Sequence, residues 1–396
     1  MKRKSLISNR SERSLRKVAP FSLNSRASIT QLVSTALTIL AAWFLGAQQV
    51  GAQNLEWAVS YNGIPASALE ETEGVVADAA GNVFATGQSG SGTGSAICTM
   101  RLSPSGTIVW KLLESKASLC GGMWGRTPLT QDAAGNLVVV GAEFTNNMSN
   151  WNPLLLKYSP AGATLQREVF DLGPFASFDG VALDASSAIY VVAHNNPNNG
   201  YPHVVHILKL GATGEILWSD SYTPGTFWGT RGGIVVTASG VCTAAGGKVI
   251  KRDLVTGAVL WEKNVTMSGG GSPLAADGAG NFYVFPFQNG LTKYDSAGNV
   301  LGVLGAISNL ASDLDVDAVG NIYIVGSTVS SKSGSDIFTQ KYNPAGGLVW
   351  STTYGKPGQY SDQGVAITVR DGHVYVGGSR YNKNLDMCTL RYTAGN

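Results

Sequence analysis

Short runs of alternating hydrophobic and polar residues follow one another along most of the chain, and the stretch from Ser312 to Tyr354 shows their arrangement most clearly. The alternation and the β-branched and aromatic content predict four strands, at Leu314–Val316, Asn321–Val325, Ile337–Tyr342 and Leu348–Tyr354. Asp317–Gly320 and Asn343–Gly346 have the composition of tight turns, and Ser327–Ser335 that of a polar loop. A meander of four short antiparallel strands is the shape of one blade of a β-propeller.

The turn between the first two predicted strands recurs along the chain. Asp-x-x-Gly-Asn stands at Asp78–Asn82, Asp132–Asn136, Asp277–Asn281 and Asp317–Asn321, and degenerate copies lie at Asp184–Ala188, Thr237–Val241 and around Asp371–His373. A third strand carrying Lys or Arg follows each turn, at Met100–Leu102, Leu156–Tyr158, Leu208–Leu210, Ile250–Arg252, Thr292–Tyr294, Gln340–Tyr342 and Leu390–Tyr392. A period of roughly forty to fifty residues is typical of propellers and solenoids. The repeats therefore predict seven blades.

The two ends of the repeat region complement each other. The last copy stops shortly after its third strand, at Arg391–Asn396, and so lacks a fourth strand. Ahead of the first copy, Asn54–Tyr61 resembles the fourth strand Leu348–Tyr354. We therefore predict an all-β, seven-bladed β-propeller of four-stranded antiparallel blades, whose ring is closed by an N-terminal strand that completes the C-terminal blade.

These motifs resemble the bacterial SBBP family of β-propeller repeats over about residues 54–396. The resemblance rests on the Asp-x-x-Gly-Asn turn, a second strand of Tyr-Val-x-Gly-Ser type, a Lys-Tyr third strand and Gly-x-x-x-Trp before the fourth, best matched by residues 74–111, 180–219 and 313–351. It implies secretion and a propeller, and the family brings no assigned catalytic residues. Thr256–Trp261 also resembles quinoprotein repeats.

The N-terminal segment has the pattern of a targeting signal. Basic residues dominate up to position 30, an apolar run covers Ile29–Gly46, and Val50-x-Ala52 is a small-residue cleavage pattern. We predict a signal peptide over 1–52 and the propeller over 53–396, in a secreted, periplasmic or cell-surface protein. The apolar run approaches membrane-spanning length, so an uncleaved signal anchor is the alternative, and only then would the protein contact a membrane.

The charge balance changes when the signal is set aside. The whole chain has 28 basic and 26 acidic residues, but positions 53–396 have 20 and 25, a formal charge of −5. This part has no basic stripe of the kind that nucleic acids need, so we expect no nucleic-acid partner. We also expect a monomer.

The four cysteines are Cys98, Cys120, Cys242 and Cys388. Cys98 and Cys388 occupy the same repeat position in neighbouring blades, where other blades have Leu or Phe, which predicts buried small hydrophobic residues. A disulfide is the alternative, and it requires Cα atoms within about 7 Å. No pair has metal-ligand spacing, and we expect no cofactor and no metal.

Binding residues are expected on the face of the ring where the loops differ between blades. The first-to-second and third-to-fourth connections are uniform tight turns, whose Asp residues we interpret as turn formers. The other connections are long and irregular, and they place aromatic, His and Arg residues together. The candidate ligand-binding residues are Trp124, Arg126, Trp151, His194, Trp228, Arg231 and Arg380. Exposed Trp faces among planar polar groups suit polysaccharides, although the Trp side chains could instead pack the tops of the blades.

Signals for catalysis are fewer. Asp179, Asp313 and Asp362, with Glu73, begin strands and could place carboxylates around the mouth of the channel, as glycoside hydrolysis needs. Our leading hypothesis is an exported, non-catalytic module that binds a polysaccharide, a cell-surface component or a protein. The alternative is a carbohydrate-active enzyme, a glycoside hydrolase or polysaccharide lyase, and a quinone-dependent oxidoreductase is the third hypothesis.

Overall fold

The structure is a computed structural model. It describes residues 53–63, 70–91, 94–119, 127–145, 150–197, 203–224, 232–265, 272–285, 290–304, 311–328, 334–355 and 360–395. All of these belong to the compact unit Val50–Asn396, and the predicted signal over 1–52 lies outside them. Within the described residues, no helix has the length and apolar character to cross a membrane.

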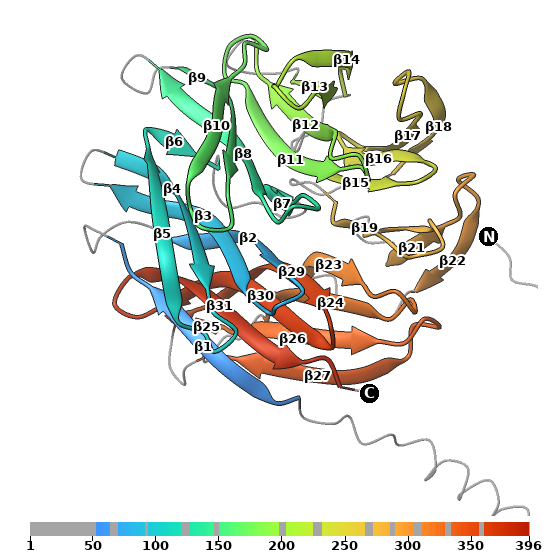
Figure 1. The fold of residues 1–396 in the computed structure, drawn as a ribbon. Helices are drawn as coiled ribbons and strands as arrows, with labels where there is room; N and C mark the ends of the chain where they lie inside the picture. The colour runs from blue at the N-terminus through green and yellow to red at the C-terminus, as the bar shows by residue number, and fades with distance from the viewer. Residues whose placement is uncertain are drawn as a thin grey trace, which may run out of the picture. The chain divides into compact units, whose positions relative to one another are not determined.

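Seven antiparallel sheets follow one another along the chain and stand in a ring, with the first and last blades side by side (Figure 1). Blade 1 comprises β2 (Glu71–Ala77), β3 (Val83–Ser91), β4 (Gly94–Leu102) and β5 (Ile108–Ser115). Blade 2 comprises β6 (Ala117–Ser118), β7 (Leu129–Gln131), β8 (Leu137–Thr145), β9 (Asn150–Tyr158) and β10 (Thr164–Val169). Blade 3 comprises β11 (Ser177–Leu183), β12 (Ile189–Asn195), β13 (Val204–Leu210) and β14 (Ile216–Tyr222). Blade 4 comprises β15 (Gly233–Thr237), β16 (Gly240–Ala245), β17 (Lys248–Arg252) and β18 (Val259–Asn264).

Blade 5 comprises β19 (Leu274–Ala276), β20 (Phe282–Val284), β21 (Leu291–Tyr294) and β22 (Val300–Leu304). Blade 6 comprises β23 (Ala311–Val316), β24 (Ile322–Ser327), β26 (Ile337–Tyr342) and β27 (Leu348–Tyr354). Blade 7 comprises β29 (Gln363–Arg370), β30 (His373–Tyr381), β31 (Leu385–Thr393) and, from the N-terminal end, β1 (Leu55–Tyr61). The predicted fold is confirmed, and β26 and β27 match their predicted bounds residue for residue. A short parallel pair, β25 (Gly334–Ser335) with β28 (Tyr360–Ser361), was not predicted.

Strand β1 closes the ring. It pairs antiparallel with β31, with Trp57 opposite Arg391 and Tyr61 opposite Met387. Tyr61 is buried in the same core cluster as Met387 and the strands of blade 1. The first and last segments of the propeller therefore share one sheet, as predicted.

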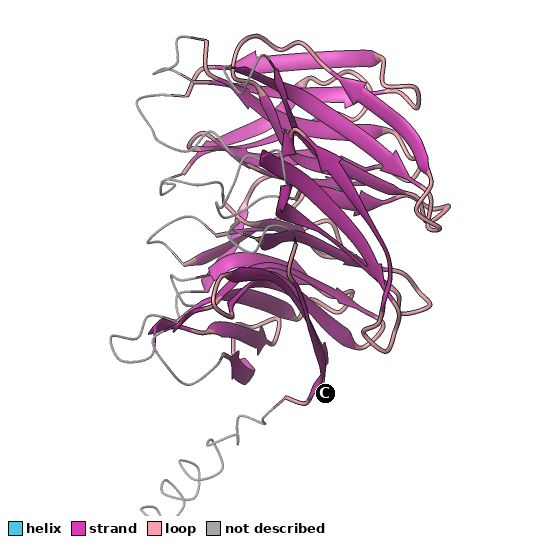
Figure 2. Ribbon diagram, turned by 90° about the vertical axis from the view of Figure 1, so that its left-hand side faces the viewer, coloured by secondary structure: helices cyan, strands magenta, loops and turns pink. Residues whose placement is uncertain are grey.

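The repeated Asp turns form as expected. In blade 6, Oδ1 of Asp317 accepts hydrogen bonds from the backbone N–H groups of Val319 (3.1 Å) and Asn321 (2.8 Å), and Oδ2 accepts one from the Asn321 amide. Gly320 adopts a φ of +88°, a backbone conformation that glycine reaches without a Cβ clash. Figure 2 shows these short turns gathered along one side of the ring. The interpretation of these Asp residues as turn formers is confirmed.

A tryptophan on the outer strand fastens most blades to the next, in an arrangement we call the tryptophan latch. In blade 1, Trp110 Nε1 donates to the carbonyl of Pro160 in blade 2 (3.1 Å), and Arg101 donates to the same oxygen (3.3 Å). The indole lies against Gly162, whose φ is +86°. Trp57, Trp218, Trp261 and Trp350 donate in the same way to the carbonyls of Pro104, Leu254, Ser296 and Ala394.

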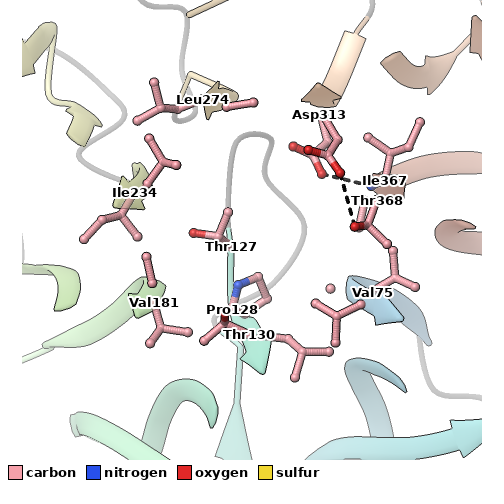
Figure 3. Close-up of a pocket in the computed structure, with 18 of the residues that line it drawn as sticks. Val75, Thr127, Pro128, Thr130, Val181, Ile234, Leu274, Asp313, Ile367 and Thr368 are labelled. Carbon is pink, nitrogen blue, oxygen red and sulfur yellow. Dashed lines mark hydrogen bonds between the residues drawn. The ribbon is translucent and has the colours of Figure 1, made fainter. Parts of the chain in front are cut away.

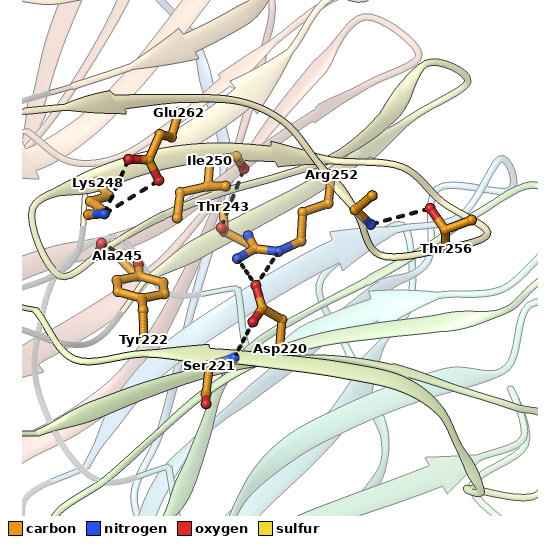
Figure 4. Close-up of polar contacts among 11 residues, drawn as sticks. Asp220, Ser221, Tyr222, Thr243, Ala245, Lys248, Ile250, Arg252, Thr256 and Glu262 are labelled. Carbon is orange, nitrogen blue, oxygen red and sulfur yellow. Dashed lines mark hydrogen bonds and ion pairs between the residues drawn. The ribbon is translucent and has the colours of Figure 1, made fainter.

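An Arg–Asp pair adds a second fastening between blades 3 and 4 (Figure 4). Arg252 is only 2% exposed, and its Nε and Nη2 donate to Oδ2 of Asp220 at 3.2 and 2.6 Å. Other blades have Leu or Tyr where β17 ends with Arg252. Because a buried guanidinium needs a counter-charge, Asp220 is what allows this position to carry an arginine.

The cysteines are core residues. Cys98, Cys242 and Cys388 are buried free thiols, whereas Cys120 lies outside the described residues. Burial raises the pKa of the Cys98 thiol to about 12. The prediction of buried small hydrophobic residues is confirmed, and the alternative disulfide between Cys98 and Cys388 is wrong because each thiol packs in its own blade-to-blade core cluster.

Candidate functional site

A channel cavity of about 300 Å³ lies where the innermost strands of all seven blades converge (Figure 3). Its wall is mainly aliphatic, with Val75, Val181, Ile234 and Leu274 around it. Glu73, Asp313 and Asp315 are the acidic residues of its lining. The carboxylates therefore lie mainly on one blade, β23 of blade 6, rather than in a ring.

Asp313 and Asp315 hold the inner edge of the neighbouring blade. Oδ2 of Asp313 accepts the backbone N–H of Ile367, and Oδ2 of Asp315 accepts that of Val369, at 2.9 and 2.8 Å. Both donors lie on β29, whose inner edge pairs with no strand in the described part of the chain. The two carboxylates supply acceptors that a further strand would otherwise provide. This contact gives Asp313, a catalytic candidate, a structural reason for its position.

The two aspartates also titrate unusually. Burial raises the pKa of Asp313 well above its ordinary value of 3.8 and raises that of Asp315 to about 6, although backbone hydrogen bonds oppose the shift. In the window between about pH 4 and pH 6, the folded protein therefore binds protons that the unfolded chain has released. The stability gained in this way is complete below about pH 4 and is lost as the pH rises through the folded pKa.

We expect Asp315→Asn to remove part of this pH dependence. The wild-type free energy of unfolding should fall relative to that of the variant between pH 4 and pH 7, by about 1–2 kcal/mol for a partly exposed group with such a shift. Urea unfolding of both proteins at the two pH values measures the difference. Parallel pH profiles would contradict the assignment of a raised pKa to Asp315.

The candidate residues of the variable-loop face fall into three groups. Trp124, Arg126, Trp228 and Arg231 lie outside the described residues. Trp151, Asp179 and His194 lie near the boundary of blades 2 and 3, and Asp362 and Arg380 lie in blade 7 or next to it. The structure thus places the described candidates at two separate positions around the ring.

An aromatic cluster surrounds Trp151. Its ring centroid lies 4.8 Å from that of Phe175 and 6.3 Å from that of Phe144, with the ring planes near perpendicular. All three side chains are partly exposed. Trp151 Nε1 is itself buried and has no hydrogen-bond partner among the described residues. The cluster therefore combines accessible aromatic surface with one unused donor.

The backbone beneath this cluster is strained. Phe175 has a φ of +54°, which is uncommon for a bulky side chain, and its N–H donates to Oδ1 of Asn150 at 2.6 Å. Ala176 N–H donates to the carbonyl of Trp151. Strained residues that their surroundings hold in place gather at functional sites. The conformation fixes the Phe175 ring against Trp151.

Next along the chain, Asp179 and His194 form a buried pair. His194 Nδ1 lies 2.7 Å from Oδ2 of Asp179, and the two side chains are 8% and 0% exposed. Because a carboxylate oxygen can only accept, Nδ1 of His194 carries the proton of this hydrogen bond. The ring centroid of His203 lies 6.1 Å from that of His194. Burial, with a smaller effect from the charge of His194, lowers the pKa of His206. The pair fixes the end of β12 beside the aromatic cluster.

Arg380 and Asp362 organise the top of blade 7. Arg380 Nη1 donates to the Tyr354 hydroxyl at 2.9 Å, and its guanidinium lies 5.3 Å from the centre of that ring. Asp362, 1% exposed, accepts the N–H of Tyr381 at 2.8 Å. These contacts leave Asp362 little access to a substrate, so a catalytic role for it stays a prediction.

The sequence did not single out Phe144, Phe175 or Asp315. Asp315 had a usable signal, because residues two apart in a strand face the same side and Asp313 was already a candidate. Phe144 and Phe175 had none, since their contacts with Trp151 depend on how a strand end and a connection between blades meet.

Comparison with known proteins supports the fold. The chain is similar in structure to BamB from Moraxella catarrhalis, with a TM-score of 0.52 and 13% sequence identity, over 86% of this chain and 100% of that chain. BamB is also a propeller, and at this identity the likeness shows the fold alone. No protein-family model and no curated protein matches the chain.

Proposed function

We propose that this protein is an exported interaction propeller that binds a protein partner through the cluster of Phe144, Trp151 and Phe175. The observation that carries the proposal is the unpaired, buried Nε1 of Trp151 between two partly exposed aromatic rings. Aromatic residues, and Trp in particular, supply a large share of the energy at protein interfaces. A carbonyl or hydroxyl of the partner would accept the indole N–H.

The geometry of the cluster favours a protein over a polysaccharide. Sugar rings stack on an open indole face, whereas Trp151 has two ring neighbours at steep angles, 67° and 80°. A compact aromatic cluster held by a strained backbone suits a side-chain pocket of a partner better than a stacking platform. Polysaccharide and other cell-surface ligands are therefore the second candidates.

Export and family membership are parts of the same proposal. The targeting pattern over 1–52 supports an exported protein, and the repeat motifs support membership of the SBBP family. A carbohydrate-active enzyme is less favoured because Asp313 and Asp315 are engaged with the backbone of β29, and Asp179 with His194. Each would have to give up a buried contact to act on a substrate.

Binding should depend on Trp151. We expect Trp151→Ala to weaken retention of a partner by about tenfold or more, and Trp151→Phe, which removes the N–H and part of the ring surface but keeps an aromatic ring, by a smaller factor. Immobilised residues 53–396 are incubated with the exported-protein fraction of the source cells and, separately, with cellulose, chitin and xylan. Val319→Ala, at a 75% exposed position in the blade 6 turn, is the matched control.

The outcomes separate the hypotheses. A protein retained by the wild type and the Val319→Ala control, but lost from Trp151→Ala with its fold intact, supports the proposal. Retention on a polysaccharide that depends on Trp151 supports the second candidate instead. Retention that ignores Trp151 would contradict the assignment of the site, and released sugars would indicate an enzyme.

A further inference from the structure

The tryptophan latch is a double contact with a single acceptor. At each of the five latched boundaries, the third-strand cation of the same blade donates to the carbonyl that the indole uses. Lys209 and Lys251, for example, reach the carbonyls of Leu254 and Ser296 at 2.9 and 2.7 Å. Arg391, Arg101 and Lys341 act in the same way at the other three. Each latch thus ties two strands of one blade to the turn of the next.

Two boundaries among the described blades carry no latch. β10 of blade 2 has Gln166 opposite Lys157, and β22 of blade 5 has Gly302 opposite Lys293, where other outer strands have Trp. With no indole beside them, these lysines turn to their own blades. Lys157 pairs with Asp132 at 3.0 Å and Lys293 with Asp277 at 3.2 Å. The latch is therefore missing between blades 2 and 3 and between blades 5 and 6.

The receiving side of the missing latches is still present. Gly214 and Gly346 keep the positive φ of the latched glycines, +91° and +84°. Against them lie Glu168 and Leu304, from the strands that lack tryptophan. The glycine backbone that receives an indole at the other boundaries is kept, and the side chains of Glu168 and Leu304 cover it in place of an indole.

Apolar packing remains at both boundaries, together with a few backbone hydrogen bonds between blades 2 and 3. Phe178 and Val181 of blade 3 pack with Val140 of blade 2, and Leu314 of blade 6 packs with Tyr283 of blade 5. Between blades 2 and 3, Val181 N–H also donates to the carbonyl of Thr127, and Ala176 N–H, just before β11, donates to the carbonyl of Trp151. No hydrogen bond joins the described residues of blades 5 and 6. Apolar contacts allow sliding that directional hydrogen bonds oppose.

We propose that the ring is jointed at these two boundaries, so that blades 3–5 (residues 177–304) move as one body against blades 6, 7, 1 and 2. The two joints divide the ring into a three-blade part and a four-blade part, each held together internally by latches. Small shear of packed elements is one of the ordinary modes of domain motion. The inference concerns the scaffold and holds whether or not the aromatic cluster is the binding site.

The position of the cluster gives the motion a consequence, which rests on the proposed function. Trp151 belongs to β9 of blade 2, and Phe175 lies in the connection that leads to β11 of blade 3. Because the N–H of Phe175 is bonded to Asn150 of blade 2, the cluster stays with blade 2 and lies beside the joint. A partner that binds the cluster and also contacts blade 3 would bind best to one setting of the two parts.

Matched pairs of spin labels test the proposal. On each outer strand, one residue directly precedes the tryptophan, or in β10 directly precedes Gln166, which stands in its place. This residue bulges out of the strand pairing and is about half exposed, as in Val109, Leu165, Leu217 and Leu260. Labels at 165 and 217 span the unlatched boundary of blades 2 and 3. Labels at 109 and 165, or at 217 and 260, span latched neighbours. Residues 53–396 with Cys120→Ser, which leaves the buried cysteines in place, provide the background.

Double electron–electron resonance then gives a distribution of the distance between the two spin labels of each pair. We expect the 165–217 distribution to be about twice as broad as the two latched ones. Gln166→Trp with Glu168→Leu copies Trp110 and Leu112 of β5, and it should narrow the 165–217 distribution to the latched width. Equal widths in the wild-type background would overturn the proposal, even if the added latch failed to fold. An unchanged width in a folded latch variant would also overturn it.

Discussion

Deleting residues 53–61 is expected to destroy the cooperative unfolding transition of this protein. The deletion removes β1, so the outer edge of β31 loses its partner along the whole of its paired length. It also removes Trp57, the latch to blade 1, and Tyr61, which is buried between the first and last blades. These losses together exceed about 5 kcal/mol, the lower end of the usual stability of a domain.

Circular dichroism during heating, together with size-exclusion chromatography, measures this effect. We expect the truncated chain to show no sharp transition and to aggregate through its open edge. A chain that begins at residue 53 is the matched control and should unfold cooperatively. A truncated chain that remains monomeric and unfolds at the control's temperature would show that β1 does not close the ring.

Asp220→Ala should have the second largest effect. It leaves the guanidinium of Arg252 buried without the carboxylate that it pairs with, and Nη1 has no hydrogen-bond partner within the described ranges to compensate. Breaking a buried pair in this way costs about 3 kcal/mol or more. Asp220 itself is about half exposed, at 44%, so the penalty arises from the buried arginine rather than from the lost aspartate.

A double variant separates the two contributions. In this variant both partners are replaced with leucine, as Asp220→Leu with Arg252→Leu. At position 252 the change gives the residue with which β4 and β13 end, Leu102 and Leu210. We expect the double variant to unfold within about 1 kcal/mol of the wild type in urea. If Asp220→Ala and the double variant are equally unstable, the cost lies in packing and not in the unpaired charge.

The repeat made the fold predictable, and irregularities of the repeat decide what was missed. Local signals such as Asp317-x-x-Gly320 specify a turn by themselves, so strands beside them were placed within a few residues. Complementary ends near Trp57 and Arg391 were enough to predict the closed ring. The parallel pair β25–β28 has only two residues in each strand, too few for any alternation to show.

The candidate site was less predictable because it depends on contacts between segments. Trp151 and His194 were predicted to lie in irregular loops, but the structure places them near strand ends, in β9 and β12. Phe175 became significant only through its positive φ. Asp179 was already a catalytic candidate, but its pairing with His194 emerged only from the 2.7 Å contact, which a sequence pattern does not report. The tryptophan latch was also only partly predictable from the sequence. The missing tryptophan at Gln166 and Gly302 is visible in the sequence, but the shared carbonyl acceptor is not.

Photocrosslinking from Phe175 tests the central claim, that the partner binds at the aromatic cluster, most directly. Benzoylphenylalanine is placed at position 175 in one protein and at Val319, on the opposite, turn-bearing face, in another. Each protein is irradiated with the exported-protein fraction of the source cells. We predict a discrete crosslinked product from position 175 that disappears when Trp151→Ala is added, and no such product from position 319. Crosslinking from 319 alone would place the partner on the turn face and contradict the account.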